Sequence, residues 1–255
     1  MRIPSTLLLI IVCLQCFSQN YDKGSAIIEY QNTNNTERPN SLYTTLSIEG
    51  HMSIFQEKYS TREFGQVKET PGVTTVFSKN DFDPYLKTDL RNKEILFYEK
   101  MGQNIFLIKD SFTDLNWEIT SETKEIAGYN CIKAIAPYRG RIWQAWFTQE
   151  IALPFGPWKL HGLPGLILEA SDTTDRYSFK VVKIEFKKSE LFKKDFNSLM
   201  RAYNKKPVNY QQFLADKEES SNNLYKEVSQ DKNINIERHK PPLPNGMETK
   251  FEWEQ

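Results

Sequence analysis

Short runs of alternating apolar and polar residues make up much of the chain between residues 26 and 181. The first is 26–30, and 42–48 and 52–56 follow with Gly50-His51 between them. A period of two puts alternate side chains on opposite faces of a strand, and a short glycine-containing gap is typical of a hairpin. Similar runs continue at 85–90, 94–99, 103–109, 117–120, 142–148 and 177–181. The pattern predicts a mainly β protein, with a single curved antiparallel sheet or half-barrel-like domain.

Beyond residue 187 the period of the apolar residues changes. Apolar side chains from Leu191 to Tyr203 follow helical spacing, and Asn209, with Gln212 three residues later, resembles a helix cap. Residues 218–235 are polar, and the proline-rich stretch 241–246 is typical of extended or disordered chain. We therefore expect a β domain at 19–187, and a short helical segment with a flexible or partner-docking tail at 188–255.

The N-terminus has the layout of a secretory signal. Arg2 precedes the apolar run 7–12, and the chain becomes polar from Gln19. The apolar run is shorter than the ~20 residues that span a bilayer. We expect a signal peptide at 1–18 and a mature chain without a transmembrane segment. Its location would be the periplasm, the periphery of the outer membrane or the extracellular space.

Cysteine and charge narrow the function classes. Cys13 and Cys16 would leave with the signal, so Cys131 has no disulfide partner and is expected in the core, not as a nucleophile. With 33 basic and 33 acidic residues, nothing favours binding to nucleic acid. The three histidines are isolated in the sequence. We expect no metal, no cofactor and no catalytic set of residues.

One motif stands out within the aromatic-rich central region. It consists of Gly162, Leu163, Pro164, Gly165, Leu166 and Ile167. These six residues are identical to the signature of the GLPGLI family of exported bacterial proteins, and 128–134, 146–151 and 156–158 also resemble that family. The resemblance implies an exported protein of a gram-negative bacterium. It implies no activity, because the family has none that is agreed.

The motif is predicted to be structural, because none of its side chains titrates or acts as a nucleophile. Its glycines permit unusual backbone angles or close approaches, and its leucines and isoleucine are candidate core residues. Trp146, Trp158 and His161 are candidate ligand or surface contacts, with His161 expected at the edge of the turn.

Three functional hypotheses remain. The first is a non-enzymatic binding or assembly protein of the cell envelope, whose partner is another envelope protein. The second is a carrier of an apolar ligand, which requires a continuous apolar pocket. The third is a hydrolase in which His161 acts with a nearby carboxylate.

Overall fold

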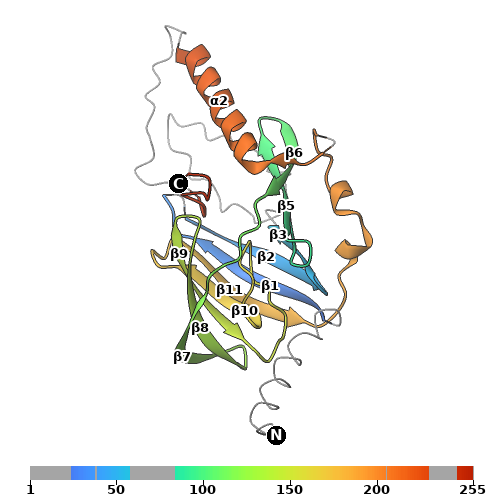
Figure 1. Cartoon of the computed structure of the whole chain (residues 1–255), viewed down its shortest axis with the longest axis vertical. Coiled ribbons are helices and arrows are strands. Elements are labelled where there is room, and N and C mark those ends of the chain that lie inside the picture. Colours follow the sequence, from blue (N-terminus) through green and yellow to red (C-terminus); the bar gives the residue numbers. More distant parts are fainter. Residues whose placement is uncertain (1–23, 38, 58–83, 205, 230–245, 255) are drawn as a thin grey trace, which may run out of the picture.

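The computed structural model describes residues 24–37, 39–57, 84–204, 206–229 and 246–254 (Figure 1). Within these ranges twelve strands form one sheet. The strands are β1 (Ser25–Asn34), β2 (Asn40–Glu49), β3 (Met52–Glu57), β4 (Tyr85–Asp89), β5 (Glu94–Met101), β6 (Asn104–Asp110), β7 (Glu118–Ile126), β8 (Tyr129–Tyr138), β9 (Arg141–Thr148), β10 (Leu166–Asp172), β11 (Tyr177–Glu185) and β12 (Val208–Asn209).

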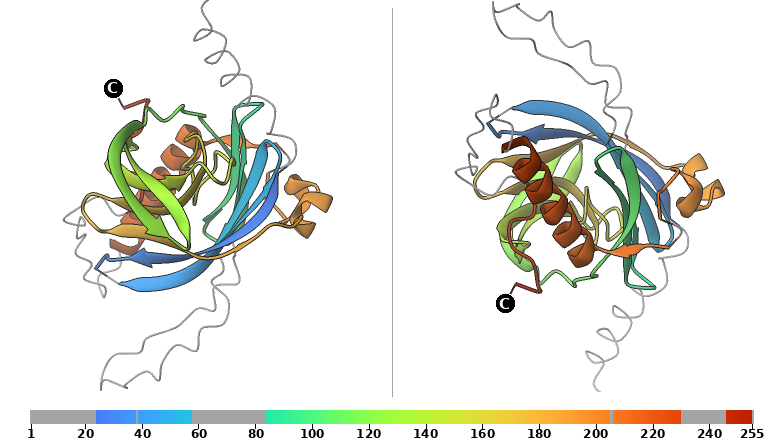
Figure 2. Two further views of the ribbon diagram at one scale, coloured as in Figure 1. Left: turned by 90° about the horizontal axis from the view of Figure 1, so that it is seen from below. Right: turned by 90° about the horizontal axis from the view of Figure 1, so that it is seen from above.

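The order of the strands is β12-β6-β5-β4-β3-β2-β1-β11-β10-β9-β8-β7. All neighbours are antiparallel except β12, which runs parallel to β6. The sheet is strongly curved, and its two ends face each other across the interior (Figure 2). The predicted fold class, a mainly β chain with one curved sheet and a C-terminal helix, is confirmed.

Local sequence explains the hairpins. Gly50, at the β2–β3 turn, has a φ of 59°, and Leu46 of β2 lies opposite Phe55 of β3. Arg139 and Gly140 form the two-residue turn between β8 and β9, with φ values of 52° and 79°. Two successive positive φ values match the twist of a tight hairpin. Arg139 is therefore held at a fixed point on the rim of the sheet.

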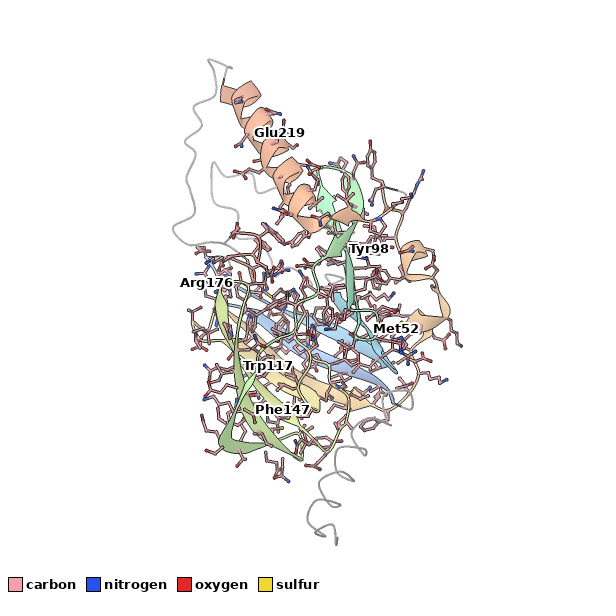
Figure 3. All side chains as sticks on the ribbon, in the orientation of Figure 1. Met52, Tyr98, Trp117, Phe147, Arg176 and Glu219 are labelled. Atoms are coloured by element: carbon pink, nitrogen blue, oxygen red, sulfur yellow. The ribbon has the colours of Figure 1, made fainter. Side chains whose placement is uncertain are left out.

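The concave side of the sheet is filled by the connection between β9 and β10 (Figure 2). Every residue from 154 to 161 is buried, as are the apolar residues Ile151, Leu153 and Leu163 on either side. The β6–β7 connection also crosses between the two ends of the sheet, and its residues Phe112, Leu115 and Trp117 pack against the same core. Side chains therefore fill most of the space that the sheet encloses (Figure 3).

The C-terminal region differs in part from the sequence prediction. The apolar residues after Ser189 form two short 3₁₀ helices, η1 (Glu190–Lys193) and η2 (Phe196–Ser198), instead of a continuous helix. The α-helix α2 (Tyr210–Ser229) begins as predicted, because the Asn209 side chain accepts a hydrogen bond from the backbone N–H of Gln212 (3.3 Å). It continues into the polar stretch that composition assigned to the tail.

The tail residues 246–254 pack against the rest of the protein. Met247 joins the main core, and the backbone N–H of Thr249 donates to the carbonyl of Arg139 (2.8 Å). The described residues after 188 are thus joined to the β domain by β12, by the first turn of α2 and by residues 246–254. The predicted signal peptide and the proline-rich residues 241–245 lie outside the described residues.

Candidate functional site

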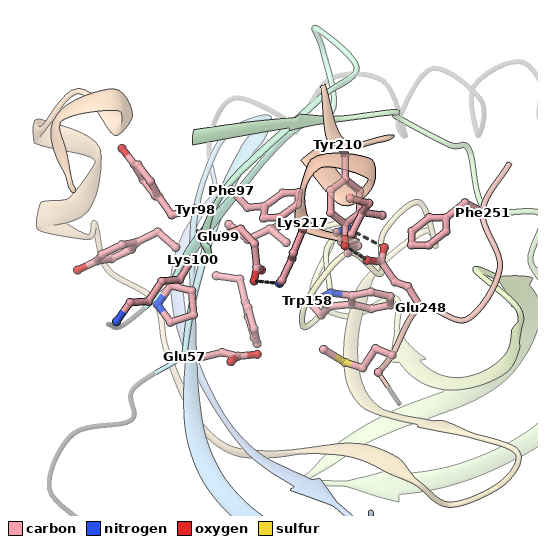
Figure 4. A pocket seen from close by; sticks show the side chains of 18 residues that line it. Glu57, Phe97, Tyr98, Glu99, Lys100, Trp158, Tyr210, Lys217, Glu248 and Phe251 are labelled. Atoms are coloured by element: carbon pink, nitrogen blue, oxygen red, sulfur yellow. Dashed lines mark hydrogen bonds and ion pairs between the residues drawn. The ribbon is translucent and has the colours of Figure 1, made fainter. Parts of the chain in front are cut away.

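A pocket of about 640 Å³ opens beside the interior of the sheet (Figure 4). One wall consists of β3, β4 and β5, and the opposite wall of the first turns of α2 and residues 246–251. The lining residues are Phe55, Glu57, Pro84, Tyr85, Leu86, Phe97, Tyr98, Glu99, Lys100, Trp158, Lys159, Tyr210, Leu214, Lys217, Gly246, Met247, Glu248 and Phe251. The pocket therefore combines aromatic faces with acidic and basic groups.

A buried group of charges lies at one side of this pocket. The Lys159 ammonium is 2.6 Å from an Asp110 carboxylate oxygen and 2.7 Å from one of Glu248. Arg139 donates to Asp110 (2.9 Å), to Glu248 (2.9 Å) and to Glu252 (2.8 Å). The side chains of Arg139 and Asp110 have no exposed surface. Paired in this way, charges that would be costly alone are compensated inside the protein.

Aromatic rings enclose the same charges. The Lys159 ammonium lies 4.7 Å from the centre of the Phe97 ring and 4.9 Å from that of Tyr210. The Tyr210 hydroxyl donates to Glu248 (2.9 Å). Burial, and then the negative charge of Glu248, raise the pKa of Tyr210, so its hydroxyl remains protonated and acts as a donor.

The Arg139 guanidinium has an aromatic cover formed by the C-terminal segment. Its centre is 4.9 Å from the Phe251 ring and 5.4 Å from the Trp253 ring. Phe251 and Trp253 stack on each other with 4.6 Å between their centres. Cation–π contacts of this kind strengthen when the cation is removed from water.

The motif Gly162–Ile167 connects the buried residues 154–161 to β10. Gly162 has a φ of 89°, which favours glycine. The backbone N–H of Ile167 donates to the carbonyl of Phe155. The carbonyl of Ile167 accepts a hydrogen bond from the Tyr30 hydroxyl (2.6 Å). Leu163, Leu166 and Ile167 are fully buried, while Pro164 is half-buried. None of the six motif residues lines the pocket.

The structure separates the three candidate contact residues. Trp158 lines the pocket and packs against Trp143, with 5.4 Å between ring centres. Trp146 is half-buried on the other face of the sheet, where the Lys124 ammonium lies 4.3 Å from its ring.

The prediction for His161 is wrong, because this residue is 3% exposed and does not lie at a surface edge. Its ring stacks on Phe112 with 4.7 Å between centres, and burial lowers its pKa to about 4. The reason for the error is that His161 ends the buried stretch 154–161, and the surface begins only at Gly162.

No pattern in the sequence predicts Arg139, Lys159 and Glu248 as site residues. They belong to a turn, a buried connection and the tail, and more than 100 residues separate Arg139 from Glu248. A local signal is present only at 248–254, where the acidic residues Glu248 and Glu252 are interspersed with the aromatic residues Phe251 and Trp253.

Within the described ranges, no helix is long and apolar enough to cross a bilayer. Among the same residues, no group of three or more His, Cys, Asp or Glu side chains is arranged to hold a metal ion.

Fold and pocket define a mainly β domain whose curved sheet carries an open pocket with a mixed polar and aromatic lining. The family described as the N-terminal domain of N-glycanase peptide matches residues 28–211, and the chain belongs to this family.

Structures of PNGF-II share the fold. The form in space group C2 has a TM-score of 0.53 and 17% identity, over 77% of this chain and 33% of that one. The form in space group P21 has a TM-score of 0.54 and 18% identity, over 77% of this chain and 34% of that one. This chain thus spans about a third of the length of PNGF-II. A comparison with curated proteins found no match.

Proposed function

We propose that this protein is a non-enzymatic binding domain that takes a glycan-bearing peptide in the pocket between β3–β5 and α2. The observation that carries the proposal is the lining of that pocket, in which aromatic faces alternate with charged hydrogen-bonding groups. Membership of the N-glycanase N-terminal family supports this class of ligand. The substrate of a whole N-glycanase need not be cleaved by such a domain, and our proposal is limited to binding.

The size and chemistry of the pocket suit an amphipathic ligand. Its volume of about 640 Å³ falls in the range of small-ligand sites, roughly 300–1,000 Å³. A sugar presents both C–H faces and hydroxyl groups. Aromatic rings such as Tyr85 and Tyr210 offer flat surfaces to the C–H faces. Glu57 and Lys100 offer hydrogen-bond partners to the hydroxyl groups.

Binding without catalysis is supported by the state of the charged groups. Glu99 is paired with Lys217 (3.0 Å), and Glu248 is paired with Lys159 and Arg139. Each of these carboxylates already accepts hydrogen bonds from a neighbouring cation. They are therefore placed to orient a polar ligand.

The two alternatives receive less support. A carrier of an apolar ligand requires a continuous apolar wall, but six of the lining residues are charged: Glu57, Glu99, Lys100, Lys159, Lys217 and Glu248. A hydrolase that uses His161 requires this side chain in a cleft. His161 is buried against Phe112 and does not line the pocket.

We further infer that the protein is exported and belongs to the GLPGLI type. The support is the apolar run at 7–12 and the six-residue identity at 162–167. An exported binding domain would meet glycosylated partners in the cell envelope or outside the cell, where they are exposed.

The test is calorimetric titration of the full chain with an N-glycosylated peptide and with the same peptide lacking its glycan. Only the glycosylated peptide should bind. Tyr85→Ala and Lys100→Ala should each weaken binding about 5-fold to 30-fold, because each removes a pocket contact on the order of 1–2 kcal/mol. Tyr43→Ala and Lys188→Ala are matched controls outside the lining residues and should leave binding unchanged.

Two results would contradict the proposal. Equal binding of both peptides would show that the glycan is not recognised. Release of the glycan during incubation, measured by mass spectrometry of the peptide, would show that the protein is an enzyme.

A further inference from the structure

We propose that the end of the β8–β9 hairpin is a docking site for an acidic-aromatic peptide, now occupied in cis by residues 246–254 and entered in trans by such a segment of a partner protein. This site adjoins the pocket proposed to bind a glycan and shares Lys159 with its lining, but it would take a different ligand. Its floor is formed by Arg139 and Lys159, and its present ligand is the carboxylate of Glu248.

The floor of the site is organised without the segment that occupies it. One oxygen of Asp110 accepts from Arg139 (2.9 Å) and the other from Lys159 (2.6 Å), so one buried carboxylate fixes both cations. Arg139 also donates to the Ser111 hydroxyl (3.1 Å). The tight turn at Arg139-Gly140 fixes the backbone. Departure of residues 246–254 would therefore leave both cations in position.

The charges specify the class of ligand. Arg139 and Lys159 carry two positive charges, and Asp110 supplies one negative charge. The floor alone thus has one positive charge in excess. With residues 246–254 in place, its three side chains are at most 2% exposed, and an unpaired charge there would be strongly destabilising. A carboxylate in the position of Glu248 neutralises this excess charge. It also accepts a hydrogen bond from the Tyr210 hydroxyl.

The site also recognises the backbone and the side chains that follow this carboxylate. The carbonyl of Arg139 accepts from the N–H groups of Thr249 (2.8 Å) and Lys250 (3.3 Å). A Cβ on Gly140 would lie 2.2 Å from the Thr249 hydroxyl, so glycine leaves room for the passing chain. Phe251 then covers the guanidinium.

The recognised pattern is therefore a glutamate followed after two residues by Phe-Glu. The second glutamate, Glu252, pairs with Nε of Arg139 and is 35% exposed. A partner segment with the same spacing would meet the same donors. Its entry would also replace Met247 and Phe251 in the wall of the pocket, which would link peptide docking to the shape of that pocket.

The experiment uses the full chain and a fluorescent synthetic decapeptide with the sequence of residues 246–255. In the parent chain the tethered segment competes at an effective concentration of the order of millimolar, so the peptide should bind weakly. The variant Glu248→Gln/Glu252→Gln should release the segment and bind the peptide at least about 10-fold more tightly by fluorescence anisotropy. A decapeptide carrying Gln at both positions should not bind.

The control variant is Glu254→Gln, which makes the same chemical change in the same segment. The Glu254 carboxylate accepts from the backbone N–H of Phe251 (2.8 Å), within the segment itself. This variant should behave as the parent does. Amide exchange at Thr249 provides a second readout, since release of the segment exposes its N–H.

Three outcomes would overturn the proposal. One is equal affinity of parent and double variant for the decapeptide. Another is equal binding of the acidic and neutral decapeptides to the double variant. The third is continued protection of the Thr249 amide in the double variant, which would show that the two carboxylates do not determine docking. A thermal melt verifies that each variant is folded.

Discussion

Gly165 lies so close to the carbonyl oxygen of Thr148 that a Cβ added to it would be only 2.0 Å from that atom. Real Cβ atoms do not approach backbone atoms to this distance. The contact joins the end of β9 to the start of β10, where Leu166 pairs with Thr148. The second glycine of the motif is thus required by a close approach of two backbones, and not by its own φ.

Gly165→Ala should destabilise the protein severely, on the order of 3 kcal/mol or more, because backbone and not a movable side chain occupies the space. Gly128→Ala is the matched control. Gly128 has a φ of 83° and nothing within 4 Å of the added Cβ, so it should lose only about 1 kcal/mol through backbone strain. Urea unfolding of both variants measures the difference. Equal losses would mean that the contact at Thr148 relaxes without difficulty.

Leu166→Asp tests the core role of the motif. Leu166 is fully buried, so the substitution places an unpaired carboxylate in the interior, with an expected loss of several kcal/mol. Val182→Asp makes a comparable change on the neighbouring part of the sheet, where the side chain is 54% exposed. It should change the free energy of unfolding by less than about 0.5 kcal/mol. A near-parental melt for Leu166→Asp would place the motif on an exposed surface.

Local patterns predicted most strands and the start of α2. Alternation fixes which side chains share a face, and this information is contained within a few residues, as in the β2–β3 hairpin. The cap at Asn209 is equally local, since it joins this residue to Gln212. In contrast, helical spacing after Leu191 did not produce a helix. Phe196 packs into a second small cluster with Tyr98, and this tertiary contact is satisfied by 3₁₀ turns.

The site could not be predicted in the same way. Glycine and proline in 154–165 are typical of exposed turns, but this connection fills the interior because a strongly curved sheet leaves a cavity to be covered. Arg139, Lys159 and Glu248 meet through contacts between distant parts of the chain. Nothing in the residues next to each of them specifies its partner, so only the assembled sheet shows the cluster.

Cys131 should be inert in the native state. It has no exposed surface, and burial raises its thiol pKa to about 11, so little thiolate forms at neutral pH. We expect a thiol reagent to label it only after denaturation, and Cys131→Ala to cost on the order of 1 kcal/mol. Val182→Cys in a Cys131→Ala background provides an exposed reference that should react at once. Rapid labelling of native Cys131 would contradict its burial.

The expected signal peptide predicts the mature N-terminus. Protein isolated from its native host should begin at Gln19, or within one or two residues of it, when sequenced from the N-terminus. Leu9→Arg places a charge in the apolar run and should block processing, whereas Ser5→Arg lies before that run and should not. Retention of Met1 in the parent protein would remove the basis for export.

His161 should make the protein sensitive to mild acid. Its folded pKa of about 4 lies below its ordinary value of 6.5, because burial opposes the charged form more than Asp114 favours it. The unfolded chain therefore binds more protons than the folded chain between these values. Stability falls as the pH decreases through 6.5, and the loss is complete near pH 4.

Between pH 7 and pH 5 this difference amounts to about 2 kcal/mol of unfolding free energy. Asp172, whose pKa is lowered from 3.8, loses its contribution only at lower pH and does not affect this interval.

His161→Gln removes the titrating group, so the free energies of unfolding of this variant at pH 7 and pH 5 should be nearly equal, whatever its stability at pH 7. Urea unfolding of the parent and of His161→Gln at the two pH values is the measurement. If His161→Gln loses as much stability as the parent, the acid sensitivity originates elsewhere and the histidine is protonated inside the folded protein without penalty.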